Sequence, residues 1–138
     1  MTTAKRFEDL EVWQRAKDLT NLIYKHSTDG MFSRDFGLRD QMRRAAVSIM
    51  SNIAEGFESQ TQAMFIKYLA YAKGSAGELR AQLYIARDLG YINDEEFNET
   101  FSLAEICSKQ LARFIQYLES QPNARRIREE GVTYNVEQ

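Results

Sequence analysis

The sequence predicts an all-helical protein, an antiparallel up-down four-helix bundle. First, apolar residues recur at helical spacing along four long stretches of the chain. Second, the 138 residues include one proline and seven glycines, whereas sheet proteins need more turn residues. Third, the segments between the four stretches are short, and short connections favour antiparallel neighbours.

The first helix is expected over about residues 9–26, followed by a loop over residues 27–33. Its apolar face consists of Leu10, Trp13, Ala16, Thr20 and Ile23. The second helix is expected over about residues 34–55. It should stop at Gly56, because glycine readily adopts the left-handed backbone that follows many helices.

Capping patterns mark the starts of the last two helices. Residues 59–62 (SQTQ) have the form of a capping box led by Ser59, and the third helix should run from there to about Leu89. Residues 93–96 (NDEE) repeat the pattern with Asn93 as the cap. The fourth helix should continue from this cap to about residue 120.

One domain is expected, because 138 residues suffice for one hydrophobic core but not for two. Residues 1–120 form the predicted bundle. The tail, residues 121–138, begins with Pro122 and has weak periodicity. It is expected to be mobile in a lone subunit, or docked on a neighbouring one.

Composition excludes several classes of protein. No apolar run approaches the roughly 20 residues that span a bilayer, and the first residues lack the apolar segment of a secretory signal. The single cysteine, Cys107, provides neither a disulfide framework nor metal-ligand spacing. We therefore expect a cytoplasmic protein without metal or cofactor. Its net charge of −2 argues against a strongly basic nucleic-acid binder, so an anion-binding surface must depend on how charges are placed.

The second helix carries a narrow polar seam in an otherwise apolar sequence. The seam consists of Arg44, Ser48, Ser51 and Glu55, with Asn52 at its edge. A helix that is apolar nearly all round should be largely covered. The seam must therefore find hydrogen-bond and charge partners, because an unpaired buried charge is very costly.

The third helix offers partners for this seam. Ser75 and Glu78 lie on one stripe, beside a face that is almost free of side chains at Gly74 and Gly77. Two glycines within a helix cost about 1 kcal/mol each relative to alanine, so we expect them to allow close helix packing. The predicted structural polar cluster, between helices or between subunits, consists of Arg44, Ser48, Asn52, Glu55 and Glu78.

A catalytic pair formed by Glu55 and Glu78 is the rival interpretation, and it would make the protein a metal-dependent hydrolase or nuclease. No metal-ligand pattern, nucleophile or phosphate-binding loop accompanies the two glutamates in the sequence. We therefore expect no catalytic residues and no enzyme activity.

Four motifs carry a family resemblance: residues 7–13 (FEDLEVW), 41–45 (QMRRA), 48–56 (SIMSNIAEG) and 74–79 (GSAGEL). They resemble motifs of the bacterial four-helix-bundle family of 23S ribosomal RNA intervening-sequence proteins. That family includes relatives of the accessory variability determinant protein of diversity-generating retroelements. The resemblance covers about residues 7–120. Many members carry proline where this chain has Met50.

The resemblance implies a cyclic homo-oligomer, a barrel-like homopentamer in known members, and a nucleic-acid-related role without catalysis. In the retroelement branch the barrel binds the reverse transcriptase and template RNA. The resemblance therefore implies RNA and a reverse transcriptase as partners, and the sequence leaves both branches of the family open.

Two sets of residues are candidates for nucleic-acid binding. On the third helix, Lys73, Arg80 and Arg87 recur every seven residues with Tyr84 between the last two, a pattern suited to phosphates and a stacked base. On the second helix, the candidates are Arg39 and Arg43. A solvated helix face is the alternative for both sets, but a ring of subunits would repeat each arginine on one surface and concentrate the potential.

Nearby acidic residues on the same helix can form ion pairs with some of these arginines, which would leave fewer of them available to a ligand. Asp35 can pair with Arg39, and Asp40 with Arg44, in the favourable order with the acid first. Arg43 is then left with a weaker local partner, Asp40, three residues before it.

A purely structural protein–protein adaptor is the alternative function. In that case the acidic start of the fourth helix would face a basic partner, and RNA binding would be absent. The acidic residues are Asp94, Glu95, Glu96 and Glu99.

Overall fold

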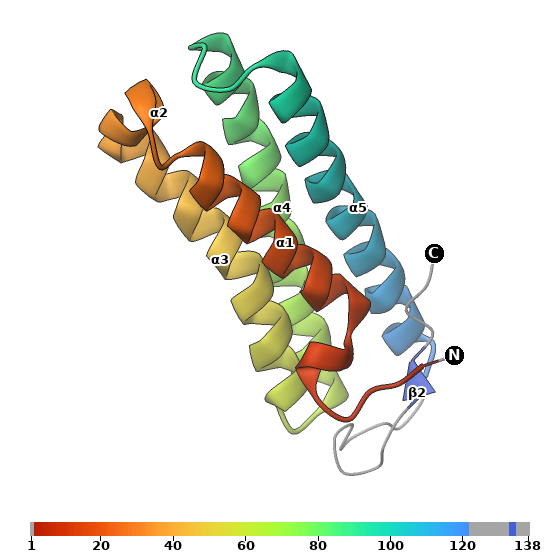
Figure 1. Ribbon diagram of the computed structural model, residues 1–138. Coiled ribbons are helices and arrows are strands. Elements are labelled where there is room, and N and C mark those ends of the chain that lie inside the picture. The colour runs from red at the N-terminus through yellow and green to blue at the C-terminus, as the bar shows by residue number, and fades with distance from the viewer. Residues whose placement is uncertain (1, 122–132, 135–138) are drawn as a thin grey trace.

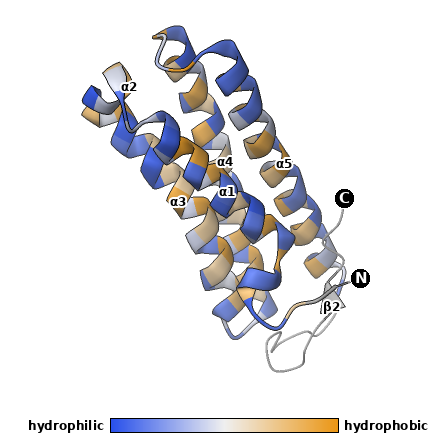
Figure 2. Cartoon of the chain, in the orientation of Figure 1, coloured by the Kyte–Doolittle hydropathy of each residue, from blue (hydrophilic) through white to orange (hydrophobic). Residues whose placement is uncertain are grey.

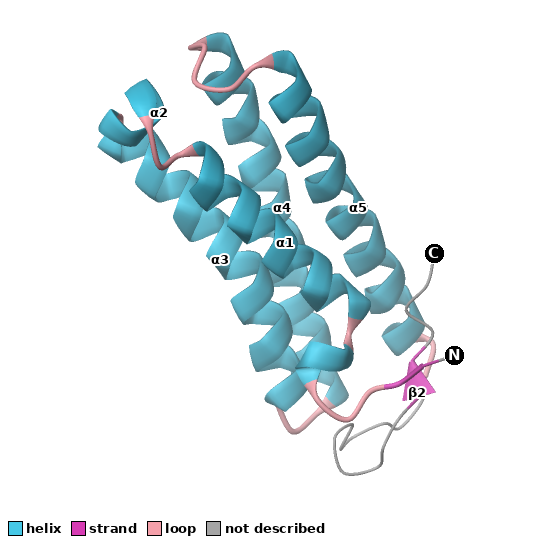
Figure 3. Cartoon of the chain, in the orientation of Figure 1, coloured by secondary structure: helices cyan, strands magenta, loops and turns pink. Residues whose placement is uncertain are grey.

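The computed structural model describes residues 2–121 and 133–134. Its elements are the 3-10 helix η1 (Phe7–Asp9) and the helices α1 (Glu11–His26), α2 (Gly30–Arg34), α3 (Phe36–Glu58), α4 (Gln62–Asp88) and α5 (Asp94–Glu119) (Figure 1, Figure 3). Two short strands, β1 (Thr2–Thr3) and β2 (Thr133–Tyr134), pair antiparallel. The prediction of an all-helical protein is confirmed, with this strand pair as a small addition.

The four long helices lie side by side around one core. Helix α3 packs against α4, α4 against α5, and α1 against both α3 and α5. In Figure 1 the connection between α3 and α4 lies at one end of the bundle, and α2 and the connection between α4 and α5 lie at the other. In the described part of the chain, no helix is long and apolar enough to cross a bilayer.

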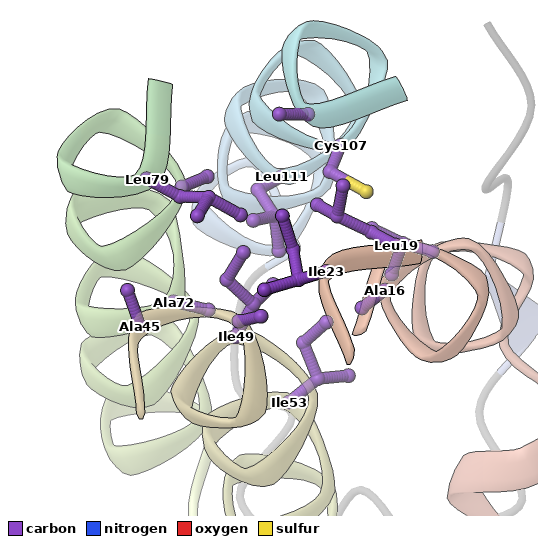
Figure 4. Packing of buried hydrophobic residues seen from close by; sticks show 14 of the residues in the cluster. Ala16, Leu19, Ile23, Ala45, Ile49, Ile53, Ala72, Leu79, Cys107 and Leu111 are labelled. Atoms are coloured by element: carbon purple, nitrogen blue, oxygen red, sulfur yellow. The ribbon is translucent and has the colours of Figure 1, made fainter. Parts of the chain in front are cut away.

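Apolar side chains from all four long helices meet in the core (Figure 4). Ile23, Ile49, Leu79 and Leu111 come from α1, α3, α4 and α5 in turn, and each is fully buried. Each such side chain stabilises the fold by roughly 1.5–3 kcal/mol relative to an exposed position. Polar residues colour much of the outside of α1 and α5 in Figure 2, as expected for helices that bury one face.

The predicted apolar face of the first helix is largely confirmed. Leu10, Ala16 and Ile23 are fully buried, and Thr20 is nearly so. The Thr20 hydroxyl is satisfied because it donates to the carbonyl of Ala16 at 2.9 Å. The hydroxyl also lies 3.1 Å from the carbonyl oxygen of Ala46 on α3. The buried threonine therefore ties α1 to α3.

The predicted end of the second helix at Gly56 is wrong, because α3 continues to Glu58. A Cβ atom on Gly56 would lie 2.9 Å from Tyr68 Cβ and 3.0 Å from Phe65 Cδ1. Gly56 is therefore required for the close approach of α4 to α3, and its backbone is helical. The predicted loop over residues 27–33 also contains the start of the short helix α2.

Capping was predicted correctly for α5 and two residues too early for α4. Asn93 Oδ1 accepts the Glu96 N–H at 2.7 Å, and Glu96 Oε1 accepts the Asn93 N–H at 2.9 Å. For α4 the cap is Thr61, whose Oγ1 accepts the Met64 N–H at 3.2 Å, and not Ser59. Apart from residue 121 and the β2 pair, the predicted C-terminal tail lies outside the described residues.

Candidate functional site

A hydroxyl pair joins α3 to α4 in the middle of the bundle. Ser48 Oγ lies 2.9 Å from Ser75 Oγ. Asn52 Nδ2 donates to both the carbonyl and the hydroxyl oxygen of Ser48, at 2.9 Å each. Ser48 and Asn52 of the predicted polar cluster therefore make a connected network with Ser75.

A groove of about 310 Å³ lies beside this network, between α3 and α4. Its lining consists of Gln41, Arg44, Ala45, Ser48, Ser75 and Glu78. Arg44 and Glu78 are both exposed, and neither forms an ion pair or hydrogen bond with any described residue. Glu55 is also exposed and unpaired within the described part of the chain. A single subunit therefore does not form the expected charge pair, and pairing between subunits stays a prediction.

The two glycines of α4 do not pack against another helix of the same subunit. A Cβ atom on Gly74 would meet nothing within 4 Å, and one on Gly77 would meet Arg80 Nη2 at 3.7 Å. Close packing was expected either within the bundle or between subunits, and the first form is not found at either position. Packing of another subunit on this face stays a prediction.

Tyr84 and Arg87 form an aromatic and cationic surface where α4 meets α5. Tyr84 is 45% exposed, and its ring lies 5.3 Å from the ring of Phe97, measured between centroids. The Arg87 guanidinium carbon lies 4.4 Å from the Phe97 ring centroid and 5.3 Å from that of Tyr84. Arg87 Nη2 is 3.5 Å from an Asp88 carboxylate oxygen. Packing on the rings fixes the guanidinium while one side remains accessible.

Lys73 and Arg80 continue this surface along α4. Lys73 is exposed and has no ion pair among the described residues. Arg80 is half-buried, and its Nε is buried without a hydrogen-bond partner among them. The Lys73 ammonium is therefore available to a bound anion, whereas the buried Arg80 Nε is not within reach of one.

Arg39 and Arg43 have structural partners that the sequence did not indicate. Arg39 Nε donates to Asp40 at 2.9 Å, so the expected pairs of Asp35 with Arg39 and of Asp40 with Arg44 are wrong. Arg43 Nε donates to Ser27 Oγ at 2.8 Å and its Nη2 to the Ser27 carbonyl at 3.1 Å. Arg43 thereby satisfies the C-terminal end of α1, where helical carbonyls lack partners.

The Arg43 guanidinium also lies 4.5 Å from the centroid of the half-exposed Tyr24 ring. The guanidinium therefore has three contacts at the end of α1, with the hydroxyl and carbonyl of Ser27 and with the Tyr24 ring, and Arg43 contributes mainly to packing. Of the two candidate sets, the α4 residues are the more available to a ligand.

Asp35 is occupied at the other end of the bundle. Its carboxylate accepts the Leu38 N–H at 3.2 Å and the Tyr91 hydroxyl at 2.9 Å. The hydrogen bond from the Tyr91 hydroxyl to this carboxylate is the largest cause of a raised pKa at Tyr91, and burial is the second. Sequence analysis missed this contact between α3 and the segment after α4.

His26 is another residue whose role emerges only in the structure. Its Nε2 lies 3.2 Å from Thr100 Oγ1, and its Nδ1 lies 3.7 Å from Glu96 Oε2. The Thr100 hydroxyl itself donates to the Glu96 carbonyl at 2.8 Å. The Thr100 oxygen is therefore left to accept the Nε2–H of His26, which joins the end of α1 to the start of α5.

Cys107 lies in the core, and burial raises the pKa of its thiol to about 12. Within the described residues, no group of three or more His, Cys, Asp or Glu side chains is arranged to hold a metal ion. The features that the structure does provide are a polar groove on α3 and α4 and a basic, aromatic surface on α4 and α5. Both features lie on the surface of a helical-bundle protein.

Comparison with known proteins identifies the family. The family model of the 23S rRNA-intervening sequence protein matches residues 8–113, and the chain belongs to this family. A solved structure from Bacteroides thetaiotaomicron, of a protein with unknown function from the S23 ribosomal protein family, is similar, with a TM-score of 0.71 and 25% identity. The match covers 76% of this chain and 98% of the other. No curated protein matches the chain.

Proposed function

We propose that this protein is a non-catalytic RNA-binding scaffold. In this proposal, antiparallel four-helix bundles assemble into a cyclic homo-oligomer, a pentamer as the family resemblance implies. The observation that carries the RNA-binding part is the surface formed by Lys73, Arg80, Tyr84 and Arg87, which we call the α4 basic surface.

The chemistry of the α4 basic surface suits a single-stranded nucleic acid. Exposed Lys73 and the half-buried guanidinium groups of Arg80 and Arg87 can contact phosphates, which position a nucleic acid without reading its sequence. Tyr84, with nearly half of its surface exposed, offers a face on which a base can stack. Base stacking on an aromatic side chain contributes roughly 1–3 kcal/mol.

Assembly would compensate for the low charge of each subunit. One subunit carries a net charge of −2, so its summed charge does not attract RNA. A ring would repeat the α4 basic surface once per subunit and raise the local potential, even though net charge stays negative. An RNA strand could then contact several subunits at once, which multiplies affinity.

A salt series with a structured RNA that carries single-stranded loops tests the proposal. The test variant is the double substitution Arg80→Glu, Arg87→Glu, and the matched control is Lys109→Glu, Arg113→Glu, which makes the same charge change at exposed positions of α5. We expect wild-type affinity to fall steeply with salt, with a logarithmic slope of about −0.7 for each phosphate contacted. The test variant should lose most binding and the control should keep it.

Circular dichroism and native mass must accompany the salt series, because Arg87 also packs on Phe97. If binding survives in a folded, assembled test variant, the α4 basic surface is not the RNA site. If the wild-type oligomer does not bind RNA even at low salt, the RNA-binding function itself is refuted.

A role as an accessory subunit of a retroelement reverse transcriptase is the narrower form of this proposal. It is supported by the motif at residues 48–56 and by family membership. A reverse transcriptase encoded beside this gene, and its co-purification with the oligomer, would be the expected results. Absence of both would restrict the role to RNA alone.

A protein–protein adaptor is the second candidate, favoured by the acidic start of α5. Asp94, Glu95 and Glu99 are exposed and have no ion pair among the described residues, whereas Glu96 is used in the capping box. These free carboxylates fit a basic protein partner. A correctly assembled oligomer that ignores RNA at low salt but binds a basic protein would favour this function.

A further inference from the structure

We infer that the C-terminal end of α4 binds an unpaired guanine base, which stacks on the Tyr84 ring and donates two hydrogen bonds to the Asp88 carboxylate. This inference rests on the proposed RNA-binding function and names the base that the α4 basic surface prefers. We call Tyr84, Arg87 and Asp88 the base site.

The Tyr84 ring is held in place before any base binds. Its centroid lies 5.3 Å from the ring centroid of Phe97 and 5.3 Å from that of Phe101. The Phe97 and Phe101 rings in turn stack on each other at 5.1 Å. Two rings of α5 therefore fix one side of Tyr84, while nearly half of this residue stays exposed. Because a fixed ring loses little conformational freedom on binding, it suits the stacking of a base.

Arg87 places a carboxylate beside this ring. Its guanidinium carbon lies 5.3 Å from the Tyr84 ring centroid, and its Nη2 lies 3.5 Å from Asp88 Oδ1. Tyr84 and Asp88 are also four residues apart on α4, a spacing that makes side chains neighbours on a helix surface. The Asp88 side chain is 63% exposed, and its carboxylate accepts no hydrogen bond from the described residues. A base stacked on Tyr84 therefore has a free acceptor at its edge.

The position of Asp88 is unfavourable for the helix and for phosphate contacts. It is the last residue of α4, where the negative end of the helix dipole repels a carboxylate. It also lies beside the Arg87 guanidinium, where a negative charge weakens any attraction of RNA phosphates. Recognition of a base by this carboxylate explains why an acid is found at such a position.

The chemistry of the four bases decides which one fits the base site. Guanine presents two adjacent donors, N1–H and the N2 amino group, and one carboxylate accepts from both. Adenine and cytosine present one amino group beside an unprotonated ring nitrogen, which a carboxylate repels, and uracil presents a single N–H between two carbonyl oxygens. Every base can stack on Tyr84, so Asp88 provides the discrimination. In a duplex this edge is paired with the other strand, so the guanine must be unpaired.

Fluorescence anisotropy at low salt measures this preference. The probes are short labelled oligouridines that carry one central guanine, adenine or cytosine, or no replacement. We expect the assembled wild-type protein to bind the guanine probe about tenfold more tightly than the others, the effect of one good bidentate contact. A central inosine, which lacks the N2 amino group, should lose most of this preference. A central 7-deazaguanine, whose donor edge is intact, should keep it.

The decisive variant is Asp88→Asn, which has nearly the same shape as wild type. It should lose the preference for guanine, while its affinity for plain oligouridine stays equal or rises because a negative charge is removed. A purely structural role of Asp88 would not separate the two affinities in this way. The matched control, Asp18→Asn, makes the same change at an exposed position of α1 and should keep the preference. Tyr84→Leu should weaken binding of every probe about tenfold, because stacking is common to all bases.

The outcomes separate the base site from RNA binding itself. Equal affinity of the wild type for all four probes would refute the inference and leave the proposed RNA-binding function standing. A guanine preference that persists in Asp88→Asn, or full affinity in Tyr84→Leu, would also refute it, because the base would then be bound elsewhere. If the wild-type oligomer binds no probe at low salt, the inference and the proposed function both fail.

Discussion

Replacing Gly56 by alanine should destabilise this protein even though alanine is the better helix former. The added Cβ would lie 2.9 Å from Tyr68 Cβ, 3.0 Å from Phe65 Cδ1 and 3.3 Å from the Phe65 carbonyl oxygen. Unstrained carbon contacts lie near 3.5–4.0 Å. Tyr68 Cβ and the Phe65 carbonyl move only if the backbone of α4 moves, so the clash cannot be relieved by a side-chain rotation.

The neighbours of Phe65 restrict relaxation further. Its ring packs edge-on against Phe57 at 5.9 Å and against Phe114 at 5.3 Å, measured between centroids. Overpacking of a core costs typically about 1–3 kcal/mol, whereas the helix propensity of alanine returns at most about 1 kcal/mol. We therefore expect Gly56→Ala to lower the free energy of unfolding by about 1–2 kcal/mol, or Tm by about 4–8 °C.

Urea denaturation followed by circular dichroism measures this change. The matched control is Gly37→Ala, also in α3, where the new Cβ would meet only Asp35 Oδ1 at an ordinary 3.9 Å. The control should match or exceed wild-type stability. If Gly56→Ala is as stable as Gly37→Ala, close packing is not the reason for glycine at position 56.

Three further predictions test individual contacts. Burial raises the pKa of Cys107 to about 12 from an ordinary value near 9. The buried neutral thiol therefore makes its full contribution to the free energy of unfolding below pH 9. The free energy of unfolding should then decrease by about 1.4 kcal/mol for each pH unit as pH rises from 9 towards 12. Unfolding measured against Cys107→Ala should show this difference, and a native thiol that reacts quickly with a thiol reagent at pH 8 would contradict it. Arg43→Lys keeps the charge but cannot reproduce both hydrogen bonds to Ser27, so it should lower the free energy of unfolding by about 1–3 kcal/mol and leave RNA affinity unchanged. A selective loss of RNA binding would instead make Arg43 a ligand contact. Asn93→Ala removes the cap of α5 and should cost about 1 kcal/mol in thermal unfolding, whereas Asn93→Ser should recover most of it.

Local features of the sequence were sufficient for much of the fold. The helical class, the buried positions of α1 and the Asn93 cap depend on residues within a few turns of one another, and helical periodicity reveals such relationships directly. Gly90, the residue after the predicted end of the third helix near Leu89, adopts a left-handed φ of +75°. Family membership was also evident from short motifs, and the match over residues 8–113 confirms it.

Gly56 shows where local reasoning fails. A glycine near the end of an apolar helix has two physical explanations, a left-handed backbone or the close approach of a neighbour. Only the position of Tyr68 on α4 distinguishes them. For Gly74 and Gly77, which were expected to allow close packing within the bundle or between subunits, no other helix of the subunit lies within 4 Å of an added Cβ.

The sequence by itself determined that four long helices form and which of their faces are buried. The tertiary structure alone decided how the polar groups are used. Arg43 reaches Ser27 across 16 positions, Tyr91 reaches Asp35 across 56, and His26 reaches Thr100 across 74. Helical periodicity follows from the geometry of one element, whereas these pairings depend on how separate helices pack, and that packing is set by the whole core at once.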